Sequence, residues 1–205
     1  MAYGLRPVGG PGTGYGYQTS GFSEYYIDVS AVAAGAGVIY SGDFVELTAT
    51  GEIDRQAGNT TGETPTTANG VRTIGVAVGF RWVTPSGTPT WSQYYDGNAS
   101  NTEAFAFVAD DPNQVFMIQS DEAIAQPTGI GGNAPVVNFA TASGSTVTGN
   151  SGIQLDGGSI ATTNTLALRI LSIPRDGVNE NSSTPNVLVR LNDGVSQFSN
   201  PLGVA

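Results

Sequence analysis

The adjacent carboxylates Asp110 and Asp111 are the side chains whose type and spacing best suit chemistry. Paired acids can ligate calcium, or can serve as the acid and the nucleophile of a glycosidase. Neighbouring residues at a strand end point in opposite directions, however, and an aspartate before Pro112 is common in turns. The same interpretation applies to the other close acidic pairs, Asp121 with Glu122 and Glu52 with Asp54. No run has the regular acid spacing of a calcium loop, so we predict no metal site and no cofactor.

Several side chains on which enzymes rely are absent from the sequence. It has no histidine and no cysteine, which excludes imidazole bases, thiolate zinc ligands and disulfides. All 7 basic residues are arginine, so a Schiff-base lysine or a phosphate-binding lysine is excluded as well. We therefore predict that the protein is not an enzyme.

A group of aromatic residues offers a second kind of chemistry, because Trp82, Trp91, Tyr94 and Tyr95 could form a platform on which a sugar stacks. Trp82 lies in phase with the apolar residues of a predicted strand, which favours a place in the core. The other three follow a turn at residues 85–89, where side chains are often exposed. We expect Trp91, Tyr94 and Tyr95 to contact a ligand or another subunit.

Short strands must position these residues. The period of two that is typical of strands recurs in residues 26–29, 38–40, 43–50, 74–83, 103–108, 115–119, 166–173 and 186–191. The stretches between them are rich in turn residues and lack helical periodicity. The sequence therefore predicts an all-β fold, a β-sandwich or barrel-like domain, with less than about 10% helix.

Residues 74–83 carry the clearest strand pattern. Large apolar residues alternate with the small residues Gly75, Ala77 and Gly79. Alternate residues of a strand share one face. We therefore expect one buried face made of Ile74, Val76, Val78, Phe80 and Trp82.

The first 21 residues differ in composition from the rest, with seven glycines and two prolines. Such a segment suits neither a helix nor a central strand. We predict an extended Gly/Tyr-rich N-terminal arm at residues 1–21 and a single β-rich domain at residues 22–205. The arm either packs on its own domain or lies along a neighbouring subunit. Its candidate subunit-binding or capsid-binding residues are Tyr3, Leu5, Arg6, Tyr15 and Tyr17.

The formal net charge of −10 argues against nucleic acid as a partner, because phosphate neutralisation needs clustered cations. The seven arginines are scattered along the chain instead. The start of the sequence lacks the pattern of a secretory signal, and the apolar runs are too short to span a membrane. We therefore expect no membrane partner.

The second half of the chain resembles a group of tailed-phage head proteins. The resemblance rests on residues 105–116 (FAFVADDPNQVF), 165–170 (TLALRI) and 186–192 (NVLVRLN), with a middle rich in Gly, Ser and Thr that includes residues 146–149 and 155–156. It covers about the last hundred residues and assigns no role to any single position. It implies a capsid decoration, or cement, protein bound to the outer surface of the virion.

Such a protein would bind the major capsid protein as a homo-trimer, bridging neighbouring subunits through added contact area and avidity. The alternative is a phage tail fibre or tail-tip module that binds host surface glycans through an exposed aromatic groove. A carboxylate glycosidase would instead need two acids in one cleft.

Overall fold

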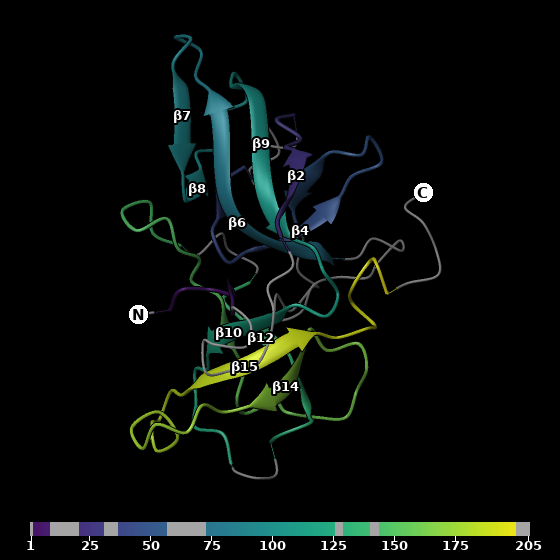
Figure 1. Ribbon diagram of the computed structural model, residues 1–205, viewed down its shortest axis with the longest axis vertical. Helices are drawn as coiled ribbons and strands as arrows, with labels where there is room; N and C mark the ends of the chain where they lie inside the picture. The colour runs from purple at the N-terminus through teal and green to yellow at the C-terminus, as the bar shows by residue number, and fades with distance from the viewer. Residues whose placement is uncertain are drawn as a thin grey trace.

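The computed structural model describes residues 2–8, 21–30, 37–56, 73–125, 129–139 and 144–199. Within these ranges the chain forms strands β1 to β15 and no helix, which confirms the predicted all-β fold. All pairings between named strands are antiparallel. Two main sheets, one with five strands and one with six, form opposite ends of the molecule in Figure 1.

The five-stranded sheet has the order β1–β10–β15–β14–β11. Its strands are β1 (Arg6–Pro7), β10 (Val115–Gln119), β15 (Asn186–Leu191), β14 (Leu168–Ser172) and β11 (Asn133–Ala134). A separate pair, β12 (Val136–Val137) with β13 (Gln154–Leu155), contributes side chains to the core beside this sheet. The three sequence-distant segments β10, β15 and β14 are therefore direct neighbours.

The six-stranded sheet has the order β2–β9–β6–β4–β5, with β7 also paired to β6. Its strands are β2 (Ser23–Tyr26), β9 (Thr102–Ala109), β6 (Thr73–Val83), β4 (Phe44–Leu47), β5 (Ile53–Arg55) and β7 (Pro89–Ser92). A short pair, β3 (Ile39–Tyr40) with β8 (Tyr94–Tyr95), completes the fold. The long strand β6 is central, because β4 pairs with its first half and β7 with its last residues.

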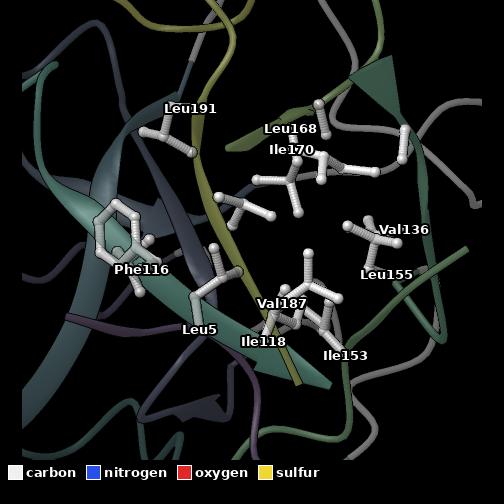
Figure 2. Packing of buried hydrophobic residues seen from close by; sticks show 14 of the residues in the cluster. Leu5, Phe116, Ile118, Val136, Ile153, Leu155, Leu168, Ile170, Val187 and Leu191 are labelled. Carbon is white, nitrogen blue, oxygen red and sulfur yellow. The ribbon is translucent and has the colours of Figure 1, made fainter. Parts of the chain in front are cut away.

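The buried residues form two large hydrophobic clusters. We call the first the lower core; Figure 2 shows Leu5, Phe116, Ile118, Val187 and Leu191 in it, together with Val136 and Leu155 of β12 and β13. The second, the upper core, lies on the other face of the six-stranded sheet and includes Ile39 and Tyr95 of β3 and β8. Burial of apolar area in these clusters is the main force that stabilises the fold.

Strand β6 is buried as predicted, but its large residues do not share one face. Register shifts at Ile74 and at Val78 each insert one residue into the strand. Such bulges reverse the alternation of side chains beyond them. Ile74, Phe80 and Trp82 therefore enter the upper core, whereas Val76 is buried in the lower core and Val78 packs, partly buried, against it.

Asp43, directly before β4, and Arg55, the last residue of β5, form a buried ion pair. Nε of Arg55 lies 3.3 Å from Oδ2 of Asp43. Arg55 also donates a hydrogen bond from Nη2 to the carbonyl oxygen of Phe139. Asp43 accepts hydrogen bonds from the hydroxyl of Ser151 at 2.5 Å and from the backbone N–H of Tyr40 at 2.9 Å. Burial raises the pKa of Asp43, and Arg55 and these two donors counteract that rise by favouring the charged form.

Candidate functional site

The N-terminal residues pack on the chain's own sheet. Leu5 is buried in the lower core, and Arg6 and Pro7 pair with Met117 and Phe116 of β10. Within residues 2–8 only Arg6 and Pro7 form a strand, and Leu5 cannot offer its side chain to a neighbouring subunit. The arm interpretation is corrected for these residues, because removing Leu5 from water stabilises the chain's own fold. Tyr15 and Tyr17 lie outside the described residues.

Close backbone contact fixes this N-terminal segment. Gly4 has a positive φ of 68°, and a Cβ there would lie 2.7 Å from Cβ of Ser151 and 2.9 Å from the backbone of Gly42. The hydroxyl of Tyr3 donates a hydrogen bond of 2.6 Å to Oδ1 of Asn186 on β15. Tyr3 is therefore held by the chain itself, and glycine at position 4 permits the approach.

Leu5 provides a direct test of this placement. Leu5→Ala should lower the free energy of unfolding by about 2–5 kcal/mol, because it leaves a cavity in the lower core. Denaturant unfolding monitored by tryptophan fluorescence measures the change. Val147→Ala is the control, since Val147 is 93% exposed and should change stability by less than about 0.5 kcal/mol. A Leu5→Ala variant as stable as the control would instead favour an arm that lies along a neighbouring subunit.

Among the N-terminal candidates that the structure describes, Arg6 is the exposed one. Its guanidinium carbon lies 4.5 Å from the centre of the Tyr3 ring, and the residue is exposed. It lines an open hollow together with Phe22, Ser41, Gln93 and Asn150. A cation at the rim of such a hollow can bind a carboxylate of a partner.

The structure separates the three aromatic residues predicted to act together. Tyr95 is fully buried, packs edge-on against Trp82 at 5.4 Å between ring centres, and donates a hydrogen bond to the carbonyl oxygen of Asn98. Burial raises its pKa. Tyr94 is half-buried and lies 6.0 Å from the ring of Tyr40. The prediction of a contact role for Tyr95 is wrong, because consecutive strand residues point to opposite faces and its side chain points inward.

Trp91 is exposed, as predicted, with 70% of its surface accessible. Its indole lies nearly parallel to the ring of Phe107, with 10° between the planes and 6.0 Å between the centres. Strand β6 runs between the strands that carry these two rings. Its Gly79 pairs with Phe107 of β9, and its Arg81, two residues further on, pairs with Trp91 of β7. A Cβ at position 79 would lie at an ordinary contact distance of 3.8 Å from Cδ2 of Phe107.

A second aromatic contact lies beside the first. The rings of Tyr26 and Phe105 are 4.1 Å apart between centres, and the guanidinium carbon of Arg81 lies 3.8 Å from the centre of Phe105. Nε of Arg81 donates to Oε1 of Glu24 at 2.5 Å, across strand β9. We call this surface the aromatic face; its residues are Glu24, Tyr26, Arg81, Trp91, Phe105 and Phe107.

The aromatic face continues the side of the six-stranded sheet that packs on the lower core. Ala109 of β9 is buried in that core, and Phe107 and Phe105 follow on the same side of the strand. Figure 1 shows β6, β7 and β9 extending beyond the five-stranded sheet, so these residues lie past its cover. Sequence reasoning missed Tyr26, Arg81, Phe105 and Phe107 as site residues, although the alternation of Phe with Ala in 104–107 was a usable signal.

The paired acids have structural roles. Asp111 accepts a hydrogen bond from the backbone N–H of Asn113 at 2.8 Å, as expected for a turn residue. Asp110 accepts one from the hydroxyl of Tyr25 at 2.8 Å. Burial, together with the hydrogen bond and charge of Asp110, raises the pKa of Tyr25 to about 12. Among the described residues no group of three or more acidic side chains is arranged to hold a metal ion.

No family model matches this chain, and no curated protein or solved structure is significantly similar to it. The described part of the chain contains no helix long and apolar enough to cross a membrane.

Proposed function

We propose that the protein is a structural subunit of a tailed-phage virion that decorates the outside of the capsid. The observation that carries the proposal is the arrangement of the segments that resemble head proteins. Residues 115–119, 186–191 and 168–172 are consecutive neighbours, β10–β15–β14, in one sheet. Three of the resembling segments thus lie side by side in one sheet and share the lower core, whereas residues 105–109 belong to β9 of the six-stranded sheet.

Charge supports a place on the outer surface. A net charge of −10 opposes contact with packaged DNA and keeps the protein soluble before assembly. The major capsid protein is the expected partner, and a homo-trimer would multiply weak contacts through avidity. Arg6 is the proposed contact residue, because its exposed guanidinium at the rim of the hollow can pair with a carboxylate of the shell.

Co-sedimentation with empty shells tests the proposal. The probe is the capsid of the phage that encodes the chain, purified from a strain that lacks this protein. We expect saturable binding at a fixed ratio to the major capsid protein, and weaker binding for Arg6→Glu. Arg175→Glu is the matched control, because it makes the same charge change at another exposed arginine. If the wild-type chain stays in the supernatant at every concentration, the proposal is wrong.

A further inference from the structure

The aromatic face is a surface that neither hydrophobic core uses. Tyr26, Trp91, Phe105 and Phe107 belong to no buried cluster, and Tyr26 and Trp91 are 59% and 70% exposed. Large aromatic side chains on an outer sheet face are costly to leave in water, and they are characteristic of binding surfaces. What they bind depends on the layout, the charge and the size of the face.

Strand register arranges the face in two rows. Tyr26 pairs with Phe105, Phe105 with Arg81, and Arg81 with Trp91, which makes one row across β2, β9, β6 and β7. Glu24, Phe107 and Gly79 form the second row. Four strands spaced about 4.8 Å apart give a row about 14 Å long, and the second row lies about 7 Å away along the strands. The side chains therefore form a short strip on one sheet face.

The charge of the face favours an uncharged ligand. Arg81 and Glu24 neutralise each other through their ion pair, so the face as a whole has no net charge. The chain around it is strongly acidic and repels anionic polymers. Arg81 nevertheless keeps N–H groups beyond Nε, and Glu24 has a second carboxylate oxygen. Both can exchange hydrogen bonds with hydroxyl groups.

The size of the face argues against a second protein chain as its occupant. Its area is of the order of a few hundred Å², whereas a stable interface buries about 800 Å² on each partner. A short oligosaccharide needs much less area. Aromatic surfaces with a few well-placed polar groups are also the usual lining of small-ligand sites.

We propose that the aromatic face binds a flat, uncharged oligosaccharide with equatorial, β-type linkages. The Trp91 indole lies nearly parallel to the Phe107 ring and is 70% exposed, so it leaves aromatic surface accessible to the apolar C–H face of a sugar ring. Tyr26 offers a second stacking position at the far end of the row, and Arg81 and Glu24 between them bind hydroxyls. A flat ligand contacts both ends of the row at once, whereas a helical α-linked glucan curves away from it. This binding role is independent of capsid decoration.

The tryptophans provide the measurement. Trp82 is 5% exposed and Trp91 is 70% exposed, so acrylamide quenches mainly Trp91. Cellohexaose and chitohexaose are the probes, and maltohexaose is the comparison. We expect the two β-linked sugars to protect Trp91 from quenching in a saturable manner. Maltohexaose should bind at least about tenfold more weakly, a difference equivalent to losing one stacking contact.

Tyr26→Ala removes one stacking ring while keeping the fluorescent probe, and should weaken cellohexaose or chitohexaose binding about tenfold. Phe198→Ala, at an exposed phenylalanine outside the face, should leave binding unchanged. Denaturant unfolding of both variants checks that each is folded. The proposal fails if neither β-linked sugar protects Trp91, or if maltohexaose binds equally well. It also fails if the chain self-associates through this face, as shown by a dimer that Trp91→Ala abolishes.

Discussion

Replacing Arg55 by methionine should lower the free energy of unfolding by about 3–5 kcal/mol at neutral pH, because it leaves the carboxylate of Asp43 buried without its cation. Methionine keeps much of the apolar volume of the arginine stem, so the loss reports mainly on charge. Denaturant unfolding at pH 7 measures it. The double variant Asp43→Asn/Arg55→Met should recover part of the loss, because no buried charge then remains.

The same variant has a predicted pH dependence. Burial already raises the pKa of Asp43 above its usual value, and loss of Arg55 raises it further. A raised carboxyl pKa means that the folded state binds the proton more tightly, so stability falls as pH rises from about 4 through the folded-state pKa. The penalty of Arg55→Met relative to wild type should thus be smaller at pH 4 than at pH 7. A penalty that does not change with pH would show that lost packing, rather than charge, causes it.

Truncation of Phe80 to alanine should cost about 3–5 kcal/mol, because the ring is fully buried in the upper core. Thermal or denaturant unfolding measures the effect. Phe198→Ala is the matched control, since the same side chain is deleted from a residue that is 51% exposed. A loss below about 1 kcal/mol for Phe80→Ala would mean that the upper core is not packed as described.

The sequence was sufficient to predict the fold class and several strands, because alternation over five or more residues is a strong local signal. The segments 115–119 and 186–191 agree with β10 and β15. Strand β6 departs from the predicted pattern. Its bulges at Ile74 and Val78 depend on pairing with β4 and β9, which are distant in the sequence, so the predicted single face was wrong.

The site residues were harder to predict than the fold. The glycines and prolines of residues 1–21 suggested an arm, but Gly4 permits a close backbone contact that places Leu5 in the core. The alternation in residues 104–108 alone is compatible with burial of either Ala104, Ala106 and Val108 or Phe105 and Phe107. The pairing of Ala106 with Phe80, and of Val108 with Ala77, turns the small residues into the upper core and leaves the phenylalanines on the opposite face of the sheet. Contacts between distant strands decide which residues are available to a partner.

The location of the protein in native phage particles tests the central proposal most directly. A phage that encodes an epitope-tagged form of this chain can be purified by density gradient, labelled with gold-conjugated antibody and imaged by negative-stain electron microscopy. Capsid decoration predicts many gold particles on the outer surface of each intact head, and none on heads from an untagged phage. Label confined to tail fibres or the tail tip, or a tagged chain absent from the particle fraction, would contradict it.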